Sequence, residues 1–126
     1  GDVYKRQALM GTLYGLNESG LSPKTVALEP LQSPLLTTGK GGSHKVEGIG
    51  VGFYPPFLDK QKIDEFVAID QEEAFEMRNL LASQHGIFCG TSTGLNVVGA
   101  IQLAKQMSPN ENVVTLGCDS GLKYLD

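Results

Sequence analysis

Short apolar runs alternate with helix-like stretches along the chain, and polar or glycine-rich turns separate them. Residues 8–16 are small and apolar, with Gly11 and Gly15 among them, which predicts a helix packed closely on a sheet. The polar run 17–20 ends in glycine and supplies the end of that helix. Residues 25–30 form a β-rich run that stops at a proline, which is typical of a buried parallel strand.

A second β-rich run, residues 63–69, leads directly into a predicted helix over residues 70–85. Asp70 is expected to cap this helix, with Glu73 as its partner in a capping box, and Gly86 is expected to end it. The positions of the expected buried face recur at spacings of three and four: Ala74, Met77, Leu80, Leu81 and Gln84.

The C-terminal part of the chain repeats this alternation, with a predicted strand over residues 87–89, a helix over 95–107 and a strand over 112–116. The order helix, strand, loop, strand, helix, strand, helix, strand predicts an α/β fold, with a parallel sheet and helices on both of its faces. Residues 31–56 are rich in glycine and proline and show neither a helical nor a strand periodicity. A loop of that length inside a compact domain usually has a function.

Charge and composition exclude several classes of partner. The net charge is −4, with acidic and basic residues interspersed, so the chain has no electrostatic footprint for nucleic acid. No apolar run approaches the roughly 18 residues of a membrane span. Cys89 and Cys118 lie in apolar runs, which suits reduced thiols better than a disulfide or a metal site. We therefore expect a cytoplasmic protein without nucleic-acid, membrane or metal partners.

The first residues are expected to be foreign to the fold. Residues 2–7 read DVYKRQ, which matches a translation of the end sequence of a transposase-based sequencing adapter. An ordinary polar tail is the alternative. In either case residues 1–7 are left out of the fold prediction, and the domain is expected to comprise residues 8–126.

An Asp-Ser-Gly turn, residues 119–121, follows the last predicted strand. Open α/β proteins bind ligands at the carboxyl ends of their parallel strands, where this turn would lie. The hydroxyl of Ser120 suits a contact with one polar atom of an otherwise apolar cofactor ring, although Asp119 or Cys118 could face the ring instead. Taken alone, the motif favours an ordinary tight turn.

Within the long loop, glycines recur at Gly48, Gly50 and Gly52. Glycine allows a backbone to approach a planar ring or a substrate closely, but this spacing does not form a dinucleotide-binding pattern. Three nearby side chains could in principle form a Schiff base or move protons, and we interpret them as solvated loop charges: Lys40, His44 and Lys45.

Residues 90–94, GTSTG, lie at a predicted strand-to-helix junction. Free amide groups at a helix N-terminus could hold an anion there. The alternative is simple capping of the helix by Thr91 or Ser92. We interpret this turn as mainly structural, with a secondary role in shaping the site.

Four blocks in order resemble the C-terminal part of the cysteine synthase and cystathionine β-synthase family, pyridoxal-phosphate enzymes of the tryptophan synthase β-like fold. They comprise residues 28–59, residues 63–94, the helix NVVGAIQLAKQ and the stretch VVTLGCDSGLKYLD. The resemblance covers essentially residues 8–126, and it implies the C-terminal part of the large domain, with the N-terminal half of the enzyme missing.

The resemblance implies a role for individual residues. Ser120 matches the serine that hydrogen-bonds the pyridine nitrogen of pyridoxal 5'-phosphate, with Asp119 and Gly48 also expected beside the cofactor. Glu47, Gly48, Ile49 and Gly50 match the loop that lines the active-site entrance. The lysine that forms the internal aldimine lies in the missing half, so we expect no catalytic residue in this chain.

The implied activity of the parent enzyme, expected to be a homodimer, is β-replacement on O-acetylserine or a similar activated serine, with sulfide as nucleophile. The chain alone is expected to be inactive. Glu47 stands where many cysteine synthases have glutamine, which leaves cystathionine formation or serine/threonine dehydration open. A stand-alone α/β module that binds a small molecule is the alternative of another class.

Overall fold

The structure is a computed structural model that describes residues 7–34, 38 and 59–125. Its helices are α1 (Gln7–Glu18), α3 (Gln71–His85) and α4 (Thr91–Ala104), and its strands are β1 (Val26–Pro30) and β2 (Glu65–Ile69). Two short 3-10 turns, η1 (Lys60–Lys62) and η2 (Gly121–Tyr124), complete the described elements. None of the described helices is both long and apolar enough to span a bilayer.

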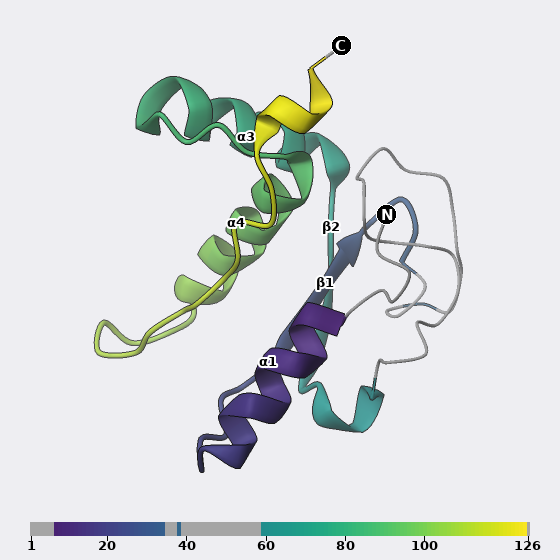
Figure 1. Cartoon of the computed structure of the whole chain (residues 1–126), viewed down its shortest axis with the longest axis vertical. Coiled ribbons are helices and arrows are strands. Elements are labelled where there is room, and N and C mark those ends of the chain that lie inside the picture. Colours follow the sequence, from purple (N-terminus) through teal and green to yellow (C-terminus); the bar gives the residue numbers. More distant parts are fainter. Residues whose placement is uncertain (1–6, 35–37, 39–58, 126) are drawn as a thin grey trace.

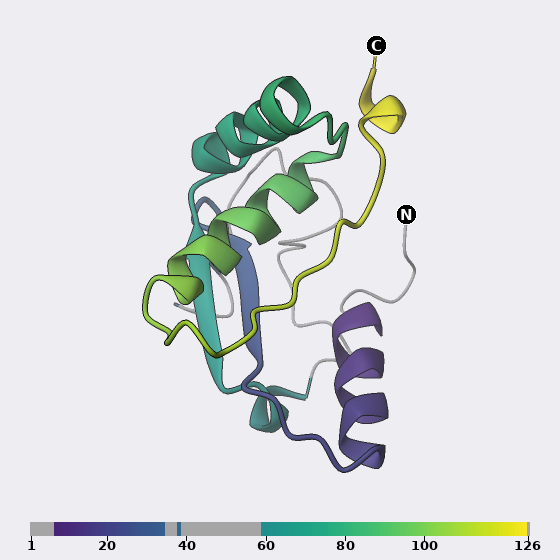
Figure 2. The same ribbon diagram turned by 90° about the vertical axis from the view of Figure 1, so that its left-hand side faces the viewer.

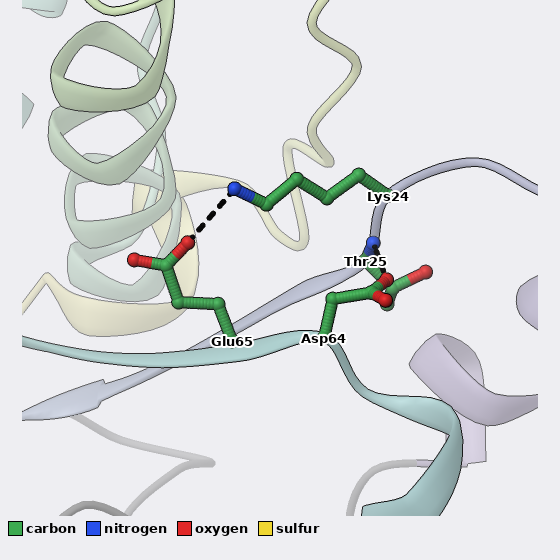
Figure 3. Close-up of polar contacts among 4 residues, drawn as sticks. All are labelled: Lys24, Thr25, Asp64 and Glu65. Carbon is green, nitrogen blue, oxygen red and sulfur yellow. Dashed lines mark hydrogen bonds and ion pairs between the residues drawn. The ribbon is translucent and has the colours of Figure 1, made fainter.

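The two strands run parallel and pair in register from Val26 opposite Glu65 to Pro30 opposite Ile69. Side-chain and backbone bonds fix this register where the strands begin (Figure 3). The Thr25 N–H donates to the Asp64 carboxylate at 2.7 Å, and the Thr25 carbonyl accepts from the Asp64 N–H at 2.9 Å. The ion pair between Lys24 and Glu65 is solvent-exposed, so we expect it to add little stability.

Helices cover both faces of this sheet, as the sequence predicts (Figures 1 and 2). On one face, Met10 and Leu13 of α1 pack with Ala27 of β1, Ile63 and the half-buried Phe66. On the other face, a second core joins the sheet to α3 and α4: Ile69, Ala74, Leu95 and Val98, with Leu28, Val67 and Met77 beside them. The α/β fold class is therefore confirmed.

Two predicted strands do not form in the described chain. Residues 87–89 make only a single antiparallel bridge, and residues 112–116 are extended without strand pairing. A β-rich run becomes a strand only when it pairs with another strand, and neither segment pairs with β1 or β2. The backbone around residues 116–118 instead bonds to side chains of α4, through Asn96 to the Leu116 carbonyl and through Thr93 to the Cys118 N–H.

The ends of α3 follow the prediction except in one detail. Gly86 adopts φ 67° and ends the helix, and the Ile87 N–H bonds back to the Leu81 carbonyl at 2.9 Å. Asp70 caps the first turn by accepting from the Glu72 N–H at 3.0 Å. The second side chain at this cap is Gln32, from just beyond β1, rather than the expected Glu73, because the end of β1 lies beside the start of α3.

Replacing Asp70 with alanine is expected to lower the melting temperature at neutral pH but not at low pH. Hydrogen bonds from the Glu72 backbone and the Gln32 side chain lower the pKa of Asp70 below its ordinary value of 3.8. The carboxylate therefore stabilises the folded state above that value, and this contribution is lost as the pH falls through the lower, folded pKa. Melting curves from pH 7 to pH 2 should show the two proteins converging, and a constant gap would contradict the prediction. Asp59→Ala, at the short turn η1, is the matched control.

Candidate functional site

The candidate site forms where two segments far apart in the sequence cross. The turn after α3 and the segment before η2 are joined by the bridge between Cys89 and Ser120. The Gly90 N–H donates to the Asp119 carbonyl at 3.2 Å, and the Gly121 N–H donates to the Phe88 carbonyl at 3.1 Å. The crossing lies at the end of the molecule toward which both strands run (Figures 1 and 2). This is the end where α/β sheets bind ligands.

Ser120 is exposed at this crossing. Its hydroxyl oxygen caps η2 by accepting from the Leu122 N–H at 3.3 Å. A hydroxyl has one hydrogen to donate, and the oxygen's role as acceptor leaves that hydrogen available to a ligand. Ser120 therefore presents a neutral donor to solvent from a backbone that is fixed on both sides. This arrangement fits a residue that donates to the nitrogen of a cofactor ring.

The Asp119 side chain turns away from solvent. One carboxylate oxygen accepts a hydrogen bond from the hydroxyl of Tyr124. The other oxygen is buried and has no hydrogen-bond partner within residues 7–34, 38 and 59–125. Of the two adjacent polar side chains, the structure thus exposes the neutral hydroxyl and partly buries the carboxylate.

Both cysteines are free, in contrasting environments. Cys89 is only 4% exposed, whereas Cys118 is exposed and accepts from the Asn96 side chain at 3.3 Å. Burial, more than any other influence, raises the pKa of Cys89; the Arg78 guanidinium opposes the rise and the Asp119 carboxylate adds to it. Cys89 is thus a neutral, buried thiol at neutral pH, unlike a catalytic nucleophile.

The start of α4 differs from its prediction. Gly90 occupies the N-cap and no side chain caps the helix, so the expectation that Thr91 or Ser92 would cap it is wrong. Thr91 accepts from the Arg78 guanidinium at 3.0 Å, and Thr93 accepts from the Cys118 N–H at 3.0 Å. These hydroxyls tie α4 to its neighbours, which agrees with the structural interpretation of this turn.

Several predicted site residues lie outside the described residues: Gly48, Glu47, Ile49 and Gly50 of the expected entrance loop, and also Lys40, His44 and Lys45. Their roles stay predictions. In the described part of the chain, no group of three or more His, Cys, Asp and Glu side chains is arranged to hold a metal ion.

Sequence reasoning missed two residues of the site, Gly90 and Tyr124. Gly90 has φ −79° and ψ 169°, which other residues adopt as readily, so backbone conformation is not the reason for glycine here. Tyr124 lies four residues after Ser120, and its link to Asp119 depends on the 3-10 turn between them. The only signal in the sequence was the tyrosine's short distance from the Asp-Ser-Gly motif.

Comparison with known proteins identifies the family. Residues 7–119 match the family described as "Pyridoxal-phosphate dependent enzyme". A probable cysteine synthase of Bacillus subtilis is 39% identical over 91% of this chain and 38% of its own length. Cysteine synthase B of Campylobacter jejuni is 42% identical over 79% of this chain and 33% of its own length.

Among solved structures, the O-acetylserine-dependent cystathionine β-synthase of Helicobacter pylori aligns with a TM-score of 0.82 at 35% identity, over 92% of this chain and 38% of that one. The chain thus spans little more than a third of the length of the proteins it matches. By this match and by its fold, the chain belongs to the pyridoxal-phosphate dependent enzymes, in the group that includes the cysteine synthases.

Proposed function

We propose that residues 8–126 are the C-terminal part of the large domain of a cysteine synthase-like enzyme. The intact enzyme would replace the β-substituent of O-acetylserine, or of a similar activated serine, by sulfide. The relatives named cysteine synthase support this activity, and the matches cover only 38% and 33% of the lengths of those relatives. The proposal includes a foreign tail over residues 1–7, although α1 begins at Gln7.

The observation that carries the proposal is the exposed Ser120 hydroxyl at the end of the sheet where ligands bind. When bound, pyridoxal phosphate supplies an electron sink for charge that develops at the substrate α-carbon. Ser120 would donate its hydroxyl hydrogen to the pyridine nitrogen and leave that nitrogen unprotonated. A neutral partner of this kind gives a weaker sink than a carboxylate, which suits replacement at the β-carbon.

The remaining roles follow from the family resemblance. The loop at the active-site entrance would line the substrate site with Glu47, Gly48, Ile49 and Gly50. The lysine that bonds the cofactor and the loop that holds its phosphate would come from the preceding part of a longer chain, so the 126-residue chain alone would show no turnover. Two free thiols favour a reducing compartment, which supports a cytoplasmic enzyme. We also propose a homodimer, as is usual for the family.

The test uses a chimera in which residues 8–126 replace the matching segment of the Bacillus subtilis relative. Ser120→Ala should weaken pyridoxal-phosphate binding roughly two- to tenfold, since one hydrogen bond is worth about 0.5–1.5 kcal/mol. Its effect on cofactor absorbance and on turnover should exceed that of the matched control Ser83→Ala, another exposed serine. Equal behaviour of the two variants would overturn the role of Ser120.

The same chimera separates the candidate reactions. Turnover of O-acetylserine with sulfide supports the proposed activity. The Helicobacter pylori match and Glu47 favour cystathionine formation as a second candidate, which homocysteine in place of sulfide would reveal. Release of ammonia and a keto acid would instead indicate a dehydratase, and a chimera that binds the cofactor without any turnover would contradict an enzymatic role.

A further inference from the structure

We propose that Tyr124 and Asp119 are positioning residues for Ser120. In this inference, which rests on the proposed function of Ser120, the Tyr124 hydroxyl holds the Asp119 carboxylate away from the cofactor. The neutral serine hydroxyl, and not the adjacent carboxylate, then meets the pyridine nitrogen. The juxtaposition that carries the inference is a carboxylate and a hydroxyl on consecutive residues. The carboxylate accepts from the Tyr124 hydroxyl, whereas the Ser120 hydroxyl accepts from the Leu122 N–H and keeps its own hydrogen to donate.

The hydrogen bond between Asp119 and Tyr124 closes a small loop around Ser120. Asp119 precedes η2 and Tyr124 is the last residue of η2, and the Ser120 oxygen caps the same turn by accepting from the Leu122 N–H. Both hydrogen bonds are therefore made within six consecutive residues, 119–124. Such a loop limits the directions in which the Ser120 hydroxyl can point.

The Asp119 carboxylate and the Tyr124 ring pack against the backbone of Gly90. A Cβ atom at residue 90 would lie 2.6 Å from Cε2 of Tyr124 and 2.9 Å from Cγ of Asp119, distances shorter than van der Waals contact. The same glycine donates its N–H to the Asp119 carbonyl. The carboxylate and the phenol ring thus pack directly on the backbone that crosses beneath Ser120.

The chemistry gives this contact a consequence for the cofactor. A carboxylate beside a pyridine nitrogen would hold that nitrogen protonated and strengthen the electron sink, whereas a hydroxyl leaves it neutral. Asp119 and Ser120 are adjacent, so a free carboxylate would compete with the hydroxyl for the ring. Tyr124 removes that competition, because a charged hydrogen bond holds the carboxylate against Gly90.

The first test measures cofactor affinity and the pH dependence of cofactor absorbance in the chimera described above. Tyr124→Phe should weaken pyridoxal-phosphate binding roughly two- to tenfold and no more than Ser120→Ala does, because Tyr124 acts on the cofactor only through that serine. It should also add a pH-dependent change in absorbance that disappears in Asp119→Asn/Tyr124→Phe. Tyr14→Phe, an exposed tyrosine on α1, is the matched control and should change neither quantity.

A double-mutant comparison separates positioning from general stability. If Tyr124 acts through Ser120, Tyr124→Phe should have no further effect on affinity in a Ser120→Ala background. An equal loss in both backgrounds would indicate a merely structural role and overturn the inference. If Ser120→Ala itself has no effect, the proposed function fails; if Ser120→Ala weakens binding and Tyr124→Phe does not, only the positioning role fails.

The second test needs no cofactor and uses the 126-residue chain. Hydrogen exchange at the Gly90 and Gly121 amides, the two donors of the bridge, should accelerate roughly tenfold in Tyr124→Phe. The Tyr14→Phe control should leave both amides protected. Unchanged exchange in Tyr124→Phe, or unprotected amides in the parent chain, would overturn the inference whether or not the chimera folds.

Discussion

Replacing Gly94 with alanine is expected to lower the free energy of unfolding by about 3 kcal/mol, the upper end of the usual cost of overpacking. Gly94 lies in the first turns of α4, where this helix crosses α3. A Cβ atom there would collide with the Ala74 carbonyl oxygen and lie 3.1 Å from the Arg78 backbone nitrogen. The obstacle is helix backbone, which cannot rotate away as a side chain can. The two helices would have to separate, which would open the core around Leu95.

Chemical denaturation checks this prediction, because a shift of the midpoint at constant slope reports a change in stability alone. Two other glycines of helices serve as controls. Gly15→Ala has no atom within 4 Å of the new Cβ, so a gain of about 0.5–1 kcal/mol is expected from helix propensity. In Gly99→Ala the atoms nearest to the new Cβ belong to the flexible side chain of Leu28, so this change should cost less than Gly94→Ala. Equal stability of Gly94→Ala and Gly15→Ala would show that α3 and α4 do not pack as described.

The elements that the sequence predicts well are those that depend on local interactions. The apolar spacing and the caps at Asp70 and Gly86 predict the bounds of α3 almost to the residue. Both caps act within a few residues of the helix terminus, so the local sequence determines them. The runs that became β1 and β2 were predicted because a proline and a helix cap bound them clearly. Burial on both faces follows from strands that are apolar on both sides.

The parts that could not be predicted depend on contacts between distant segments. Residues 112–116 have the composition of a strand, but pairing requires a partner that their own sequence does not specify. The turn with Gly90 and Gly94 was interpreted as mainly structural, but the sequence does not show that both glycines are required for space against residues 119, 124 and 74. The prediction of Ser120 as a site residue came from a motif, whereas the packing of Asp119 and Tyr124 on Gly90 depends on how the chain crosses itself.

Gly90→Ala should release the Ser120 segment locally and leave the rest of the fold in place. The added methyl group collides with the Asp119 carboxylate and the Tyr124 ring, and neither residue belongs to the core cluster of α3 and α4. The segment can therefore move away without opening the core of α3 and α4. Cys89, now 4% exposed beside Ser120, would lose its cover, and its pKa would fall as burial and the Asp119 carboxylate cease to raise it.

Alkylation of the two thiols measures this release, with the exposed Cys118 as an internal reference. Cys89 in Gly90→Ala should react at least about fivefold faster than in the parent chain, since overpacking of about 1–3 kcal/mol favours the open form by that factor or more. Gly117→Ala is the matched control, because its new Cβ would lie 3.8 Å from Thr93, an ordinary contact, and Cys89 should stay protected. A denaturation midpoint close to that of the parent, together with fast labelling of Cys89, would distinguish local release from the global loss expected for Gly94→Ala. Slow labelling of Cys89 in Gly90→Ala would contradict the close packing of the Asp119 carboxylate and the Tyr124 ring against Gly90.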